Sequence, residues 1–285
     1  MKLTVVTQKP FSFAQTLTFM KRFPPCQAET IITDDSVTAA VSIGGRAWPF
    51  TLRGDHNLTL EVPDDAPRSI ARRASDFIGA TDDLAALYKA AEADPPFRTL
   101  VTSLYGLHQV RFLGLEEIAV YCVMMQRAPI AMATRLKRKF LERFGRPVTI
   151  GSATIRAMPE LGELAKLDGE DIARAIGHRS KGQRIATVVR GVAAIGEDFL
   201  RTAKYADARD ALLEIPGIGP FSAGAILLRG LGRVEQVPSL EMFATEARAV
   251  YGNTWDEAAV QRRYGEQIGY WSFYVKTGAS RVVGR

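Results

Sequence analysis

Residues 213–222, Leu-Glu-Ile-Pro-Gly-Ile-Gly-Pro-Phe-Ser, constrain the fold more than any other stretch of the chain. The residues before them have helical spacing that ends near Ile215. Gly217 and Gly219 allow backbone angles that are closed to other residues. Pro220 suits the first position of a new helix, where its missing N–H is not needed. The sequence therefore predicts two helices joined by a tight glycine turn.

The predicted turn has the chemistry of an anion site. Free N–H groups at the start of the second helix, together with the dipole of that helix, attract negative charge. Because the glycines lack a Cβ atom, a phosphodiester can approach the backbone. Such a contact positions a nucleic acid without reading its bases. A plain helix corner with a glycine C-cap is the alternative for a bare Gly-x-Gly, but the pattern here is longer.

The composition limits the class of protein. Of 285 residues, 47% are hydrophobic and 24% are charged, which is typical of a globular protein. No apolar run is long enough to cross a bilayer, so we expect no membrane contact. The opening residues, MKLTVVTQKPFSF, lack the apolar core of a signal peptide, which predicts a cytoplasmic protein. The net charge of +6 fits a polyanionic partner, although proteins with no nucleic-acid role are often equally basic.

The cysteines and histidines argue against a metal or cluster cofactor. Cys26 and Cys122 lie far apart, and neither belongs to a Cys-x-x-Cys pair. This excludes a disulfide framework, a cysteine zinc site and a cysteine-bound iron–sulfur cluster. His56, His108 and His178 are scattered, with no metal-ligand spacing. We therefore expect no cofactor of these kinds.

The first 66 residues have the pattern of an α+β domain. Residues 13–23 have helical spacing, whereas residues 36–43 alternate between apolar and polar positions. A Gly-Gly pair then signals a two-residue hairpin before a return strand at 46–52, and a further strand is expected at 58–62. These patterns predict an antiparallel sheet with one helix.

After a proline-bearing linker at 63–68, the chain has almost only helical patterns. Asp82, Asp168 and Ser180 are placed as possible helix N-caps. The expected helices lie at 82–93, 116–127, 130–144, 170–176, 182–195 and 208–215.

The full hairpin pattern, L-x-x-I-P-G-I-G-P-aromatic-S-A before an apolar helix, resembles the helix-hairpin-helix of DNA glycosylases. Residues 113–145 resemble the stretch around the minor-groove wedge in the 3-methyladenine DNA glycosylase II (AlkA-like) branch of that HhH-GPD superfamily. Trp-Ser-Phe-Tyr at 271–274 resembles the W-R-S-Y of the same branch. The resemblance implies a mainly α, two-lobed helical region at 67–285, with its hairpin at 208–231, after an N-terminal α+β domain at 1–66.

The resemblance also implies that the partner is double-stranded DNA and that a nucleotide is flipped out of the duplex into a pocket. An inserted side chain fills the gap that is left. By position this wedge is Arg127 or its neighbour Ala128. The family often has an apolar wedge, so Arg127 is a departure, and a solvated helix end is the alternative. The contacts expected on the hairpin are Gly217, Ile218, Gly219, Phe221, Ser222 and Ala223.

A second candidate DNA contact is the basic stretch at 178–184, which includes Arg179 and Lys181. Positive charge at a helix start is unfavourable for the helix dipole, so a phosphate partner would account for it. An ordinary solvated loop is the alternative.

Aromatic side chains near the matching motifs are candidates to stack on a flipped base. They are Trp271, Tyr274, Phe112 and Tyr105, although aromatic residues more often belong to a core. Phe221 occupies the position at which strand-cleaving relatives have a Schiff-base lysine, so the resemblance implies no lyase activity.

The family resemblance further implies a monovalent cation, Na⁺ or K⁺, on the hairpin carbonyls of Leu213, Ile215 and Ile218. No side chain indicates this ion. The C-terminal cysteine set of the iron–sulfur relatives is missing. We expect a monomer.

Glu241 stands where the family has its catalytic aspartate, counting without gaps from Pro216. A carboxylate there would stabilise the positive charge that forms on C1′ and orient the attacking water. Glutamate is one methylene longer, and a displacement of about 1 Å can cost roughly 100-fold in rate. The alternative is structural, because Ser239 is a plausible N-cap and an acid in the first turn stabilises any helix.

These patterns together predict a monofunctional glycosylase of base excision repair that hydrolyses the N-glycosidic bond of a damaged base, with an alkylated purine as the expected base. A lesion-binding protein of the same fold with little turnover is one alternative. A glycosylase for another modified base is a second. Fold alone does not decide between them.

Overall fold

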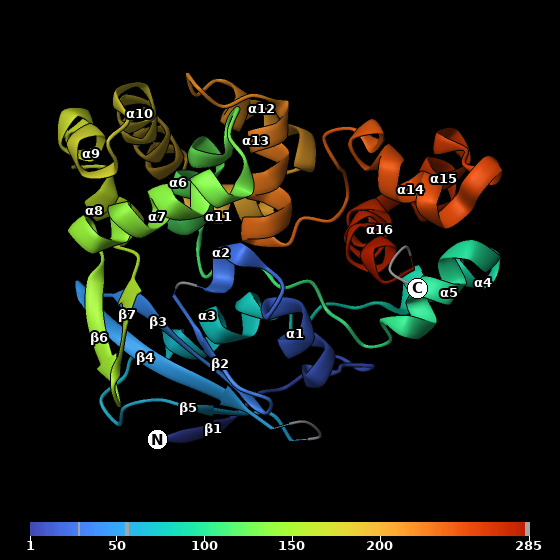
Figure 1. The fold of residues 1–285 in the computed structure, drawn as a ribbon, viewed down its shortest axis with the longest axis horizontal. Coiled ribbons are helices and arrows are strands. Elements are labelled where there is room, and N and C mark those ends of the chain that lie inside the picture. Colours follow the sequence, from blue (N-terminus) through green and yellow to red (C-terminus); the bar gives the residue numbers. More distant parts are fainter. Residues whose placement is uncertain (28, 55–56, 283–285) are drawn as a thin grey trace.

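The computed structural model describes residues 1–27, 29–54 and 57–282 (Figure 1), and His56 therefore lies outside the described residues. A five-stranded antiparallel sheet occupies the N-terminal part, in the order β1-β5-β4-β3-β2. The Gly-Gly turn joins β3 to β4 with positive φ at both glycines, which confirms the predicted hairpin. The strands are β1 Lys2–Thr4, β2 Ile31–Ile32, β3 Ser36–Ile43, β4 Arg46–Arg53 and β5 Thr59–Glu61.

Three helices accompany this sheet. Helix α3 packs on it through Ile70, Ala74 and Phe77, so the core of the N-terminal part extends beyond residue 66. The helices are α1 Phe13–Met20, α2 Pro24–Gln27 and α3 Ser69–Phe77.

A second, two-stranded sheet interrupts the helical region, where the sequence analysis expected almost only helices. Strands β6 (Arg146–Ile150) and β7 (Ala153–Ala157) form a hairpin that turns at Gly151, where φ is +60°. Ile155 and Ala157 pack against Ala40 of β3. The hairpin therefore joins the helical region to the N-terminal sheet, as Figure 1 shows at the left.

The remaining chain is mainly helical and forms two lobes with separate cores (Figure 1). One lobe runs from α6 to the second helix of the hairpin. Its elements are α6 Leu115–Met125, α7 Ile130–Phe144, α8 Leu161–Leu164, α9 Gly169–Ile176, α10 Arg179–Ile195, α11 Glu197–Thr202, α12 Tyr205–Leu213, α13 Pro220–Ala225 and the π-helical segment η1 Ile226–Gly230.

The other lobe combines two early helices with the C-terminal ones, so the chain visits it twice. The elements are α4 Ala85–Glu92, α5 Pro95–Ser103, η2 Leu240–Phe243, α14 Ala244–Tyr251, η3 Gly252–Thr254, α15 Glu257–Tyr264, η4 Gly265–Gln267 and α16 Ile268–Val282. No helix in the described part of the chain has the length and hydropathy needed to cross a membrane.

Asp168 caps α9, as predicted, because its side chain accepts a hydrogen bond from the N–H of Glu170 at 2.7 Å. Two of the other predicted caps are not caps. Helix α10 begins after His178, so Ser180 lies within its first turn. Asp82 instead binds the guanidinium of Arg111. Ser239 does cap η2, because its Oγ accepts a hydrogen bond from the backbone N–H of Glu241.

Candidate nucleic-acid interface and cavity

The predicted hairpin forms between α12 and α13. Gly217 has φ of +98°, and a Cβ atom there would come within 2.7 Å of the side chain of Arg184. Gly217 is therefore required both for its backbone angle and for a close approach. Around Gly219 nothing lies within 4 Å of a built Cβ, so this part of the turn faces open space. Pro220 takes the first position of α13, as expected.

Gln126 ties the hairpin to the turn between α6 and α7. Its Nε2 donates to the carbonyl of Gly217 at 2.7 Å and to Ser222 Oγ at 3.3 Å. Its Oε1 accepts from Arg184 Nη1 at 2.8 Å. Because one amide side chain bridges both segments, the two turns form one surface. Sequence reasoning did not single out Gln126, although it stands next to the predicted wedge.

Arg127 projects from this surface. It is exposed, and its φ of +50° makes it the only non-glycine residue with positive φ among the described residues. A left-handed backbone costs an L-residue about 1–2 kcal/mol. Ala128 is half-buried, and its N–H donates to the carbonyl of Met125 at 3.2 Å. Of the two wedge candidates, the exposed tip of the turn is therefore Arg127.

The prediction that Lys181 contacts DNA is wrong. Its side chain is buried, and Nζ donates to the carbonyls of Val123, Met124 and Gln126 at 3.1, 3.0 and 2.6 Å. These carbonyls lie in the last turn of α6 and at its C-cap, where carbonyls have no N–H four residues later in the helix, so the ammonium caps that helix. The Val123 carbonyl also accepts a hydrogen bond from the N–H of Gln126 at 3.2 Å. Burial, and then the nearby Arg184, lower the pKa of Lys181. Arg179 is exposed, as a phosphate contact requires, and lies 3.5 Å from Glu170 Oε1.

A cavity of about 540 Å³ lies between the two helical lobes. It is large enough for a nucleobase, since small-molecule sites span roughly 300–1,000 Å³. Ile130, Phe221 and Met242 line it and are each between 43% and 50% exposed, so its rim is apolar and open. The aromatic residues on its wall are Phe19, Phe23, Phe221, Phe243 and Phe273.

The predicted base-stacking residues lie elsewhere. Trp271 and Tyr274 are fully buried in the core of the C-terminal lobe and do not line the cavity. Trp271 Nε1 donates to the hydroxyl of Tyr251, and Tyr274 donates to the carbonyl of Leu107, both at 2.9 Å. The buried polar ends of these two side chains thus have partners inside the protein.

Phe112 and Tyr105 also lie away from the cavity wall. Phe112 packs behind Phe23, at 6.1 Å between ring centroids, and Tyr105 stacks on Tyr88 in a different hollow. On α16 the cavity side is instead occupied by Phe273. The family motif pointed to Trp271 and Tyr274, which flank Phe273 on α16. Residues adjacent in a helix point in different directions, so helical periodicity would have distinguished Phe273 from them.

Glu241 is exposed and lies on η2. Pro238 and Met242, on either side of it in the sequence, line the cavity, but Glu241 does not. No aspartate or glutamate of the described chain lines this cavity. The carboxylate predicted to be catalytic therefore stands at the rim.

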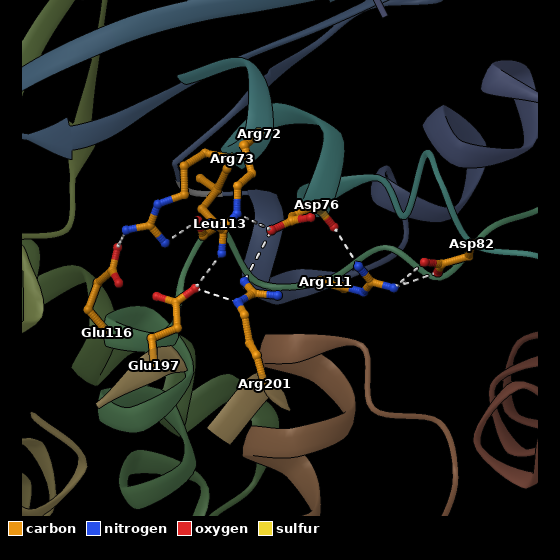
Figure 2. A network of polar contacts seen from close by, with 9 residues as sticks. All are labelled: Arg72, Arg73, Asp76, Asp82, Arg111, Leu113, Glu116, Glu197 and Arg201. Atoms are coloured by element: carbon orange, nitrogen blue, oxygen red, sulfur yellow. Dashed lines mark hydrogen bonds and ion pairs between the residues drawn. The ribbon is translucent and has the colours of Figure 1, made fainter. Parts of the chain in front are cut away.

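A polar network holds the strap at 107–114 (Figure 2). Gln109 of this strap lines the cavity. Arg111 Nη2 donates to Asp82 Oδ2 at 2.6 Å, and Arg73 donates to the carbonyl of Leu113 and pairs with Glu116 at 2.8 Å. Burial opposes the charge on Arg111, but Asp82 outweighs this effect and raises its pKa. Tyr270 of α16 also donates to Asp82. The strap is thereby fixed to α3 of the N-terminal part and to α16 of the C-terminal lobe.

The three carbonyls predicted to hold a monovalent cation lie at the end of α12 and in the hairpin turn. The Ile215 carbonyl accepts a hydrogen bond from the N–H of Ile218 at 3.0 Å, which leaves it one free lone pair. The donor set of neutral carbonyl oxygens suits Na⁺ or K⁺ on general grounds. Among the described residues, no cluster of three or more histidine, cysteine, aspartate or glutamate side chains is placed to hold a metal.

The curated proteins that the chain resembles in sequence are DNA repair proteins. No family model matches the chain. The chain is 27% identical over 164 residues to the DNA-3-methyladenine glycosylase of Bacillus subtilis, which covers 57% of this chain and 54% of that protein. It is also 27% identical over 191 residues to a probable bifunctional transcriptional activator and DNA repair enzyme AlkA of Mycobacterium tuberculosis, covering 66% of this chain and 38% of that protein. The chain thus spans about half, or less, of the length of these curated relatives.

Solved structures share the fold over nearly the whole chain. The 3-methyladenine DNA glycosylase of Archaeoglobus fulgidus has a TM-score of 0.77 at 19% identity and covers 99% of this chain and 98% of its own. The 8-oxoguanine glycosylase/lyase of Clostridium acetobutylicum, in complex with double-stranded DNA, has a TM-score of 0.71 at 12% identity and covers 95% and 92%. With the hairpin and the two lobes described above, these matches show that the chain has the fold of these DNA glycosylases and is similar in sequence to AlkA-like ones.

Proposed function

We propose that this protein is a monofunctional DNA glycosylase of base excision repair that flips a damaged base into the cavity between its lobes. One observation carries the proposal: the hairpin, the exposed Arg127 and the aromatic cavity meet on one side of the molecule, joined through Gln126. Two residues connect these parts, because both line the cavity. Met125 directly precedes the wedge turn, and Phe221 lies in the first turn of α13. The protein would act as a monomer on nucleoid DNA in the cytoplasm.

The proposed steps use separate parts of this surface. Backbone N–H groups of the hairpin, those of Gly217, Gly219, Phe221 and Ser222, would hold a phosphate, with the helix dipole adding attraction. Arg127 would enter the duplex and replace the flipped nucleotide. The aromatic wall would stack on the extruded base. Arg179 would contact a further phosphate.

Glu241 is the proposed catalytic acid. A carboxylate near C1′ stabilises the positive charge that forms as the glycosidic bond breaks, and it orients the water that attacks. Because Glu241 stands at the rim, η2 would have to bring it toward the sugar when DNA binds. A damaged purine that is already a good leaving group needs little further assistance. An alkylated purine is the substrate that the printed names of the relatives suggest.

A second candidate function is lesion binding without base release. The specific observation that favours it is the absence of any carboxylate among the described residues that line the cavity. In that case Glu241 would stabilise η2 from its first turn, with Ser239 as the cap.

Release of free base separates the two functions. Duplex DNA treated with an alkylating agent, and duplexes with oxidised or deaminated bases, are incubated with the wild type, Glu241→Gln and the exposed control Glu266→Gln. Free bases are detected by mass spectrometry. Release by the wild type and the control, reduced at least 100-fold in Glu241→Gln, supports a glycosylase with this acid. Equal release by all three keeps the enzyme and removes Glu241 from its role. Tight binding to abasic-analogue DNA with no release from any substrate supports the lesion-binding protein.

A further inference from the structure

The floor of the cavity holds an arginine that no acid neutralises. Arg229 lies in the π-helical segment η1, a kind of segment that often occurs at functional sites. Its guanidinium lies 4.9 Å from the ring of Phe23 and 5.6 Å from that of Phe273. Nη2 donates to the carbonyl of Val110 at 2.8 Å, but Nε is buried with no hydrogen-bond partner. Among the described residues no ion pair includes Arg229.

A second polar side chain beside it is also unsatisfied. Gln109 has no exposed surface, it lines the cavity, and neither its Oε1 nor its Nε2 has a hydrogen-bond partner. Its position is fixed, because its N–H donates to Tyr270 and the strap that carries it is held by Arg111 and Asp82 (Figure 2). Buried polar groups nearly always have partners in folded proteins, so two unsatisfied ones on one cavity wall indicate a ligand that supplies them.

The charge of the cavity restricts that ligand. Arg22, Arg229 and Lys276 line it, and no carboxylate of the described residues does. Lys276 pairs with Glu246, so Arg229 is the deepest uncompensated charge. Burial lowers the pKa of Arg229 to about 10, and the side chain stays charged at neutral pH. A cationic base would face this charge among apolar side chains, where like charges repel more strongly than in water.

We propose that Arg229 and Gln109 select the flipped base, and that they select an uncharged oxo base over a cationic alkylated one. This inference rests on the proposed function of the same cavity. A carbonyl oxygen of the base would accept the free Nε–H of Arg229. The adjoining N–H/C=O edge would pair with the carboxamide of Gln109, which offers one donor group and one acceptor. Glutamine can also pair with an adenine edge, so Arg229 decides the class of base.

The test compares binding of two bases that differ in charge. Three duplexes carry at one position a hypoxanthine, a 7-methylguanine or a tetrahydrofuran abasic analogue. The two modified nucleotides have a 2′-fluoroarabino sugar, which resists hydrolysis. Dissociation constants are measured for the wild type, Arg229→Lys and Gln109→Leu, with circular dichroism as a check of folding. The tetrahydrofuran duplex reports DNA binding without any base.

We expect the wild type to prefer hypoxanthine over 7-methylguanine by at least about tenfold, one tenfold step being 1.4 kcal/mol. Arg229→Lys and Gln109→Leu should each lose most of the hypoxanthine affinity and keep that for tetrahydrofuran. Equal or tighter binding of 7-methylguanine by the wild type overturns the inference, and so does full hypoxanthine affinity in both variants. If a variant fails to fold, the wild-type comparison still decides.

Failure of the inference differs from failure of the proposed function. If the protein prefers hypoxanthine but releases no base from nucleotides with unmodified sugars, the proposed selectivity holds and the proposed glycosylase activity is wrong. If the protein releases 7-methylguanine and shows no preference in binding, the proposed glycosylase activity holds and the proposed selectivity is wrong. If the wild type binds none of the three duplexes, both the proposed function and the proposed selectivity are wrong.

Discussion

Lys137→Met removes the only cation from a buried group of three charges. In α7, Lys137 Nζ donates to Glu29 Oε2 at 2.8 Å, to Glu117 Oε1 at 2.5 Å and to the carbonyl of Pro25 at 2.8 Å. The lysine is 1% exposed and both carboxylates are buried. These contacts fasten α7 to α6 and to the segment that follows the cavity residue Phe23.

The magnitude follows from the two carboxylates left behind. Removing one partner of a buried ion pair costs about 3–5 kcal/mol, because the remaining charge is neither solvated nor paired. Glu117 keeps a hydrogen bond from the N–H of Leu113 at 2.7 Å, which limits the loss. We expect the free energy of unfolding to fall by about 4 kcal/mol at pH 8, out of the roughly 5–15 kcal/mol that holds a typical domain.

The loss should depend on pH in one direction. Burial raises the pKa of Glu29, and Lys137 opposes that rise. Without the lysine the folded-state pKa of Glu29 increases further above its unfolded value. An acid with a raised folded pKa destabilises the protein as pH rises above the unfolded value, by up to about 1.4 kcal/mol per pH unit for one proton. The variant should therefore be less destabilised at pH 5 than at pH 8.

Urea unfolding at both pH values measures this effect. The exposed Lys139→Met, two residues away on α7, is the matched control, and its stability should change by less than about 0.5 kcal/mol. A loss below about 1 kcal/mol for Lys137→Met at pH 8, or a larger loss at pH 5 than at pH 8, would refute the reasoning.

Three further predictions concern the DNA surface. Lys181→Met should lower the free energy of unfolding by about 2–3 kcal/mol, measured by urea, because three carbonyls lose a charged donor; an unchanged midpoint would contradict the cap. Gly217→Ala should cost about 1–2 kcal/mol from its left-handed backbone and weaken binding to duplex DNA, which fluorescence anisotropy measures; full affinity would exclude the turn from the interface. Arg179→Ala should reduce the slope of log K against log salt by about 1 with no loss of stability, and an unchanged slope would place Arg179 off the DNA.

The hairpin could be predicted because its determinants are local. Two glycines and a proline at fixed spacing specify the turn, and the structure places both helices as expected. The β3–β4 pair is equally local, with a Gly-Gly turn between alternating strands. The β6–β7 hairpin has similar signals, a Gly-Ser pair flanked by Val148, Ile150 and Ile155, but it was hidden between strong helical patterns.

The residues that sequence reasoning misplaced depend on distant partners. Lys181 reads as a surface cation because nothing nearby reveals the carbonyls of α6, which lie 55 to 58 residues earlier. Trp271 and Tyr274 match a family motif, but burial is set by α5 and the strap at 107–114, and the motif does not encode it. Gln109 and Arg229 both line the cavity, but they are far apart in the sequence, and only the tertiary structure brings them to one wall.

The central claim is that a nucleotide leaves the duplex and enters the cavity while the hairpin and Arg127 hold the DNA. A crystal structure with a duplex that contains one tetrahydrofuran nucleotide measures this directly. We predict a phosphate on the hairpin N–H groups of Gly217, Gly219, Phe221 and Ser222, the side chain of Arg127 in the gap of the base stack, and the extruded sugar at the cavity mouth beside Phe221. A duplex that binds on another face, or that stays stacked with Arg127 in solvent, would contradict the account.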